Sequence, residues 1–204
     1  MSIKEFNDLE SYNVRLYETE HFAVIPSLGS IVEGWLLIIP KEHYLSYGYI
    51  ESQALLDELK KLIDYVGGIV KQVYGDYVIF ENGAYCSNKL VGCGVDYAHI
   101  HIVPIKIDLI KYVKDYFGIN YNWKHILSMD ATSSYINNGT PYLYYRNQEG
   151  VSFVATDSSI PSQLFRKAIA RSVGKEEQYD WKSNPFYENV ARSVVAYKQM
   201  FDKQ

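Results

Sequence analysis

Hydrophobic and polar positions in the first half of the chain alternate in short runs of the kind that form strands. Apolar runs rich in β-branched and aromatic residues occupy residues 14–17, 21–25 and 35–39, and proline and glycine separate them. Two further runs follow at residues 77–80 and 98–105. Because the first runs are joined by short connections, they predict an antiparallel meander.

Residues 52–74 carry a helical pattern instead. Apolar side chains recur there at intervals of three and four residues, with charged side chains between them. The apolar positions are Leu55, Leu56, Leu59, Leu62, Ile63, Val66, Ile69, Val70 and Val73. The pattern predicts one long helix packed on a sheet. Gly67 and Gly68 lie inside it, where each glycine costs up to about 1 kcal/mol relative to alanine, so we expect a neighbour to pack closely against the helix there.

The second half of the chain has a different pattern. We expect a polar loop at residues 120–138 and a hairpin formed by residues 142–146 and 151–155. Helices are expected at residues 108–117, 161–174 and 184–201.

These elements together predict the α+β class. A core domain at residues 1–106 is expected to hold an antiparallel sheet of about five strands and the long helix. Residues 107–204 are expected to form a mixed C-terminal extension that packs on this core.

Composition narrows the classes of partner. The chain has 204 residues, 48% of them hydrophobic, with 20 Lys and Arg against 24 Asp and Glu and a formal net charge of −4. No global positive field favours a nucleic-acid duplex. The longest apolar run, residues 35–40, is far shorter than the roughly 20 residues of a membrane span. Because the first residues show no export or transit pattern, we expect a cytoplasmic protein without a membrane partner.

Three histidines are candidates for chemistry. In a strand, His99 and His101 face the same side as Tyr97, while Ile100 faces the other. If the apolar side packs under the long helix, both imidazoles lie beside a cleft. Their ordinary pKa near neutrality suits each of them to act as an acid, base, nucleophile or metal ligand. His43 directly follows the strand at residues 35–39, a common place for a functional side chain.

Three motifs in the expected order make the chain similar to the histidine triad (HIT) superfamily of nucleotidyl hydrolases and transferases. The superfamily signature is His-φ-His-φ-His-φ-φ, where φ is hydrophobic, and residues 97–103 follow it with Tyr97 in place of the first histidine. Residues 34–43 and 80–83 also fit. The resemblance covers roughly residues 12–106, and three ordered motifs are far more specific than a His-x-His pair alone.

This resemblance implies covalent catalysis on the α-phosphate of a nucleotide. His99 matches the nucleophile, and His101 matches the histidine that stabilises the phosphate oxygens. His43, Asn82 and Tyr97 fall at substrate-binding positions. The implied substrate is a dinucleoside polyphosphate, a nucleoside phosphoramidate or an adenylated conjugate, with adenine as the expected base. The implied mechanism needs no metal or cofactor, and a homodimer is the expected assembly.

Tyr97 departs from the pattern and keeps a second function open. A tyrosine hydroxyl with an ordinary pKa near 10 is a poor proton shuttle at neutral pH. The alternative is a nucleotide-binding sensor or interaction module that has the fold but no useful turnover.

A zinc site is the other alternative. Two histidines separated by one residue on a strand can supply two ligands. Cys86, Cys93 and Asp96 are the candidates for the remaining positions, although the cysteines do not form a CxxC pair.

Overall fold

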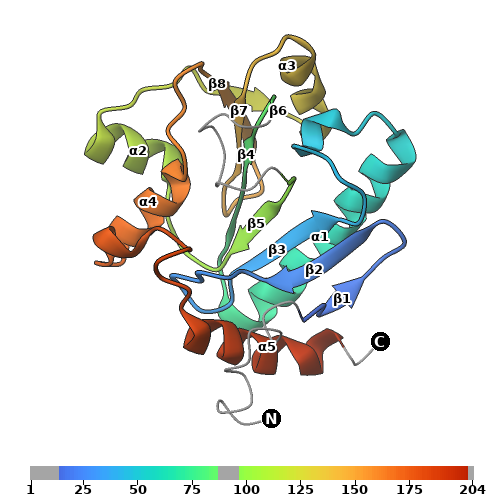
Figure 1. Ribbon diagram of the computed structural model, residues 1–204, viewed down its shortest axis with the longest axis vertical. Helices are drawn as coiled ribbons and strands as arrows, with labels where there is room; N and C mark the ends of the chain where they lie inside the picture. Colours follow the sequence, from blue (N-terminus) through green and yellow to red (C-terminus); the bar gives the residue numbers. More distant parts are fainter. Residues whose placement is uncertain (1–13, 87–96, 202–204) are drawn as a thin grey trace.

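The computed structural model describes residues 14–86 and 97–201, whose strands form one antiparallel sheet in the order β1-β2-β3-β5-β4-β7-β8-β6 (Figure 1). The strands are β1 Tyr17–Glu18, β2 Phe22–Pro26, β3 Leu36–Pro40, β4 Val78–Gly83, β5 Ile100–Val103, β6 Lys124–Ile126, β7 Tyr142–Arg146 and β8 Ser152–Thr156. The predicted α+β class with an antiparallel sheet and a long helix is confirmed.

The sheet is larger than the expected five-stranded core. Strands β1 to β5 match the predicted set, but β4 also pairs with β7 of the extension, with Phe80 opposite Tyr145. The β7–β8 hairpin therefore continues the core sheet, and a division of the chain after residue 106 stays a prediction. The short edge strand β6 and helix α3, Ser133–Asn137, form within the segment expected to be a loop.

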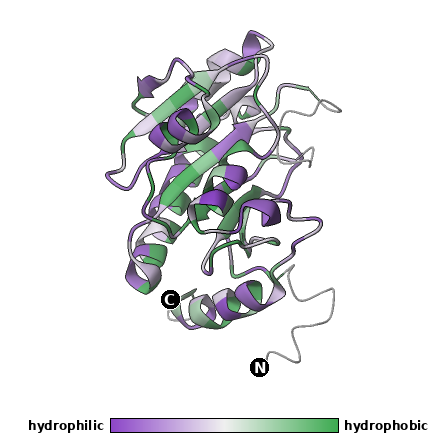
Figure 2. Ribbon diagram, turned by 90° about the vertical axis from the view of Figure 1, so that its left-hand side faces the viewer, coloured by the Kyte–Doolittle hydropathy of each residue, from purple (hydrophilic) through white to green (hydrophobic). Residues whose placement is uncertain are grey.

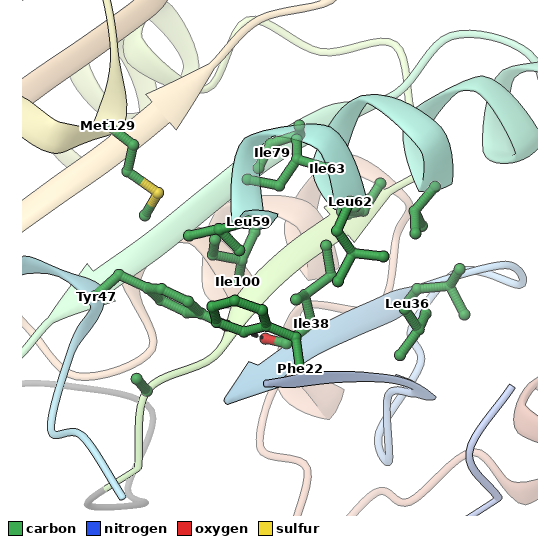
Figure 3. Packing of buried hydrophobic residues seen from close by; sticks show 14 of the residues in the cluster. Phe22, Leu36, Ile38, Tyr47, Leu59, Leu62, Ile63, Ile79, Ile100 and Met129 are labelled. Atoms are coloured by element: carbon green, nitrogen blue, oxygen red, sulfur yellow. Dashed lines mark hydrogen bonds between the residues drawn. The ribbon is translucent and has the colours of Figure 1, made fainter. Parts of the chain in front are cut away.

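Helix α1, Gln53–Tyr74, covers one face of the sheet and follows the predicted apolar pattern. It begins after Ser52, whose hydroxyl accepts a hydrogen bond from the backbone N–H of Leu55 and satisfies one otherwise unpaired helix donor. Figure 3 shows Leu59, Leu62 and Ile63 of α1 among the side chains packed over the sheet.

The glycine pair inside α1 does not break the helix. A Cβ atom added to Gly67 would lie 2.2 Å from the hydroxyl oxygen of Tyr77, so a larger side chain has no room there. The expected close packing is confirmed at this position. A Cβ atom at Gly68 would meet no atom within 4 Å, so close packing does not account for the second glycine.

The opposite face of the sheet is covered by two helices of the extension, α2 Leu109–Phe117 and α4 Leu164–Ser172 (Figure 1). Trp35, Phe80 and Phe165 are fully buried between them and the sheet. The helices carry both hydrophilic and hydrophobic positions along their length (Figure 2), as expected for helices with one apolar face.

Helix α5, Tyr187–Phe201, returns to the core end of the molecule, below β2 and β3 in Figure 1. Its Tyr197 and Phe201 join the cluster under α1. Within residues 14–86 and 97–201, no helix combines the length and the apolar character that crossing a membrane requires.

Candidate functional site

The signature histidines lie on the sheet face that α1 does not cover. On β5, Ile100 and Ile102 belong to the core under α1, whereas His101 lies opposite Phe80 of β4 and Leu37 of β3. Residues that pair directly in antiparallel strands project from the same face. The predicted alternation, with His99 and His101 on one side and the isoleucines on the other, is therefore confirmed.

His99 is half-buried, and its ring orientation is fixed by the backbone of Tyr97. The Nδ1 atom lies 2.7 Å from the carbonyl oxygen of Tyr97. A carbonyl oxygen only accepts hydrogen bonds, so Nδ1 carries the proton and donates it. In the neutral ring, Nε2 then holds the lone pair, which is the form that a nucleophile or a base requires.

His101 is only 3% exposed, so it does not lie beside an open cleft as expected from the sequence. Its ring stacks on Phe80, with ring centroids 4.3 Å apart, and meets the indole of Trp35 edge-on at 5.6 Å. The indole N–H of Trp35 donates to Nδ1 at 3.0 Å. An indole nitrogen only donates, so His101 carries its proton on Nε2.

The electrostatic surroundings keep His101 neutral. Burial is the main cause that holds its pKa well below the usual value of 6.5. The positive charge that His99 carries when protonated and the charge of Arg166 lower the pKa further. The two imidazoles lie 4.8 Å apart at an interplanar angle of 73°. Adjacent rings thus adopt opposite tautomers, one with a basic Nε2 and one with a donating Nε2–H.

Tyr97 links His99 to the loop that carries His43. Its hydroxyl group lies 2.7 Å from the carbonyl oxygen of Pro40 and 3.2 Å from that of Glu42, and it donates to them. The exposed imidazole of His43 meets the Tyr97 ring edge-on, with centroids 5.3 Å apart. Burial raises the pKa of Tyr97, so its hydroxyl stays protonated at neutral pH. In this geometry, Tyr97 anchors the loop that carries His43.

Asn82 comes to the same face from β4. Continuing the β4–β5 register by two residues beyond Phe80 and His101 places Asn82 opposite His99. The Asn82 side chain is 8% exposed. Contacts thus link His43, Tyr97, His99 and His101 around the start of β5, and the strand register places Asn82 on the same face.

Glu81 is a buried carboxyl group on the other face of β4, beside this cluster. It accepts hydrogen bonds from the backbone N–H of Tyr47 at 2.8 Å and from the hydroxyl group of Tyr142 at 2.5 Å. These bonds join the short 3-10 helix η3, Tyr47–Tyr49, to β7. Burial raises the pKa of Glu81 to about 7, and its hydrogen bonds oppose that rise.

Two residues outside the five site candidates also border the cluster. Trp35 was placed in a strand run and in the motif at residues 34–43 without a role of its own, but its indole fixes the tautomer of His101. Arg166 of α4 places its guanidinium carbon 4.8 Å from the centre of the Trp35 ring. Its place beside Lys167 on α4 gives no sign of this contact, because a helical pattern does not identify the partner that a helix meets.

The alternative zinc site receives no support from the described side chains. Of its possible further ligands, Cys93 and Asp96 lie outside the described residues. Within the part of the chain that the structure describes, no group of three or more His, Cys, Asp or Glu side chains is arranged to hold a metal ion.

A cavity of about 140 Å³ lies on the α1 side of the sheet, between α1 and the β7–β8 hairpin. It is lined by residues such as Leu59, Asp64 and Arg146 and by none of the five candidate residues. This cavity is therefore separate from the histidine cluster.

Comparisons with known proteins match less than half of the chain. It is 26% identical over 89 residues to an uncharacterized HIT-like protein of Methanocaldococcus jannaschii, a match that covers 44% of this chain and 66% of the relative. No protein-family model matches.

Two solved structures are also similar. A hypothetical histidine triad nucleotide-binding protein of Sulfolobus tokodaii is 26% identical with a TM-score of 0.37, over 44% of this chain and 58% of that protein. A Hit-like protein of Bartonella henselae involved in cell-cycle regulation is 20% identical with a TM-score of 0.38. That match covers 45% of this chain and 65% of the Bartonella protein. The chain thus spans less than two thirds of each of these proteins.

Proposed function

The chain is related to the histidine triad superfamily over part of its length, and on that premise we propose that it is a nucleotidyl hydrolase or transferase with His99 as its nucleophile. The observation that carries the proposal is the pair of opposite tautomers at the start of β5. His99 offers a lone pair on Nε2, and His101 offers a neutral Nε2–H donor beside it. Substitution at the phosphorus of an α-phosphate is favoured by this combination of a nucleophile and a donor to the developing negative charge.

In the first step, Nε2 of His99 forms a bond to the α-phosphorus of the nucleotide, and the bond from that phosphorus to the leaving group breaks. The leaving group departs with the bonding electron pair. An amine leaving group, unlike a polyphosphate, also takes up a proton from the solvent as it departs. In the second step, water or another acceptor attacks the same phosphorus and gives up its proton to the solvent. The P–N bond breaks, and its electron pair returns to Nε2 of His99. The Tyr97 carbonyl stabilises the Nδ1–H of His99 throughout both steps.

The remaining candidates have binding roles in this proposal. His43 and Asn82 contact the phosphate or the nucleoside, and His101 donates to a phosphate oxygen. The substrate is a dinucleoside polyphosphate, a nucleoside phosphoramidate or an adenylated conjugate, with adenine as the base. Homodimer formation stays a prediction.

Turnover by the wild-type protein tests the function directly. Diadenosine tetraphosphate and an adenosine phosphoramidate are incubated with the protein, with and without inorganic phosphate, and the products are separated by chromatography. We expect AMP from at least one substrate because water resolves the nucleotidyl-histidine. A shift from AMP to ADP in the presence of phosphate would identify phosphate as the acceptor. Absence of AMP and ADP from both substrates would contradict the proposal for these leaving groups.

The Tyr97→Phe variant tests whether Tyr97 anchors the loop or transfers a proton. The variant keeps the ring against His43 but removes the donor to Pro40 and Glu42. We expect a loss of about 1 kcal/mol in the free energy of unfolding and a rise in KM, with little change in kcat. Thermal unfolding and steady-state kinetics measure these effects. Tyr44→Phe, which removes a hydroxyl bonded to the Glu42 side chain, is the matched control. A large fall in kcat for Tyr97→Phe alone would assign its hydroxyl to the chemistry.

The second candidate is a nucleotide sensor without useful turnover. The observation that favours it is the engagement of the Tyr97 hydroxyl by two backbone carbonyls, which leaves this residue unsuited to proton transfer. Calorimetric titration with AMP distinguishes the two functions. Equal AMP affinity in wild type and in His99→Ala, with no turnover by either protein, would support the sensor.

A further inference from the structure

Arg166 is a charged residue that the extension buries beside the histidine cluster. Arg166 is only 1% exposed and lies on helix α4 between Phe165 and Lys167. Two backbone carbonyls hold the guanidinium group. Nε donates to Tyr179 at 3.0 Å, and an Nη atom donates to Gly29 at 2.6 Å. These bonds fix the plane of the guanidinium group over the indole of Trp35.

The extension also holds Trp35 through the backbone of the preceding residue. The Gly34 N–H donates to the Ser193 hydroxyl at 2.7 Å, and the Tyr197 hydroxyl donates to the Gly34 carbonyl at 2.8 Å. Both partners belong to α5. Gly34 has a φ of +85°, and an added Cβ atom would lie 2.7 Å from the Tyr74 ring, so a larger side chain is excluded there. Trp35 is thus held at its ring by α4 and next to its backbone by α5.

Trp35 in turn decides which nitrogen of His101 carries the proton. The indole donor occupies Nδ1 at 3.0 Å, and the Phe80 ring stacks on the imidazole. If the indole turned away, Nδ1 would lose its donor and the two tautomers of His101 would become closer in energy. A fixed indole therefore keeps the proton of neutral His101 on Nε2.

We propose that Arg166 is a positioning residue of the active site, which fixes the Trp35 indole and through it holds His101 as a neutral Nε2–H donor. The catalytic part of this inference, in which His101 donates to a phosphate oxygen, rests on the proposed function. The guanidinium group acts in two ways. The guanidinium group holds the indole by packing over the face of the Trp35 ring. Its positive charge also disfavours protonation of His101, which would place a second positive charge nearby. The C-terminal extension then completes the site, although the family motifs lie entirely in the core.

Nuclear magnetic resonance of the ring nitrogens tests the proposal without any substrate. In ¹⁵N-labelled wild-type protein, we expect His101 to show a protonated Nε2 and an unprotonated Nδ1 that accepts a hydrogen bond. Trp35→Phe removes the indole N–H, so Nδ1 is expected to lose the signature of an accepted hydrogen bond and the Nδ1–H tautomer is expected to gain population. A His101 proton on Nδ1 in the wild type, or an unchanged pattern in folded Trp35→Phe, would overturn the proposal. Because no turnover is required, these outcomes are independent of whether the proposed function holds.

Variants of Arg166 separate its charge from its hydrogen bonds. In Arg166→Met, we expect kcat to fall about 10-fold. The acidic limb of the pH profile of kcat is expected to move to higher pH, because His101 is protonated more easily once the positive charge of Arg166 is gone. Arg166→Lys keeps the charge, so it is expected to restore part of the rate and the original acidic limb. Arg171→Met, on the same helix but paired with Glu176 at the surface, is the matched control. If Arg166→Met folds and keeps the wild-type tautomer of His101 and the wild-type pH profile of kcat, the proposal is wrong and Arg166 has only a structural role.

Discussion

The His99→Asn variant is expected to lose turnover by about 10⁴-fold or more while it still binds nucleotide. Asparagine has no ring nitrogen that can form the covalent bond to phosphorus, so only catalysis by the remaining site groups survives. Steady-state kinetics measures the loss, and AMP titration measures binding. Intact-protein mass after rapid quenching is expected to increase by one nucleotidyl group in the wild type and to remain unchanged in His99→Asn.

The matched control for this prediction is His125→Asn. His125 lies on the exposed edge strand β6, where its ring contacts Phe153, so its loss is expected to leave turnover unchanged. If turnover survives in His99→Asn to within about 10-fold of the wild type, the covalent mechanism is wrong. If His125→Asn also loses turnover, the effect of His99→Asn is not specific to the site.

The Glu81→Gln variant is expected to alter the pH dependence of stability by about 3 kcal/mol. The ordinary pKa of this carboxyl group is 4.5, and burial raises its pKa in the folded protein to about 7. Between these values, the folded state binds more protons than the unfolded state, so the stability of the wild type falls as pH rises. Glutamine does not ionise and keeps an acceptor for Tyr47, so this fall is expected to disappear in the variant.

Urea unfolding of both proteins at about pH 4.5 and about pH 8 measures this difference, with the free energy of unfolding compared at each pH. Tyr142→Phe is a second variant in the same network. The Tyr142 hydroxyl lowers the pKa of Glu81, so its removal is expected to raise that pKa and extend the loss of stability to higher pH. Equal pH dependence in the wild type and Glu81→Gln would show that the Glu81 carboxyl group ionises at an ordinary pKa.

The sequence by itself determined the local elements and the face of the sheet on which the histidines lie. Strand alternation predicted that His99 and His101 project from one face of the sheet and Ile100 from the other. The three- and four-residue spacing predicted the apolar face of α1. These patterns are local, because each depends only on the geometry of one strand or one helix. Helix α2 and the β7–β8 hairpin of the extension also match ranges that local signals predict.

Only the tertiary structure decided how the extension meets the core. β6 lies in a polar stretch with mostly exposed side chains, so its strand geometry follows from pairing with β8 rather than from its own pattern. The pairing of β4 with β7 and the contact of Arg166 with Trp35 join residues far apart in the chain. The tautomers of His99 and His101 depend on hydrogen bonds to Tyr97 and Trp35. No periodicity encodes these contacts, because they arise only when separate elements are packed against each other.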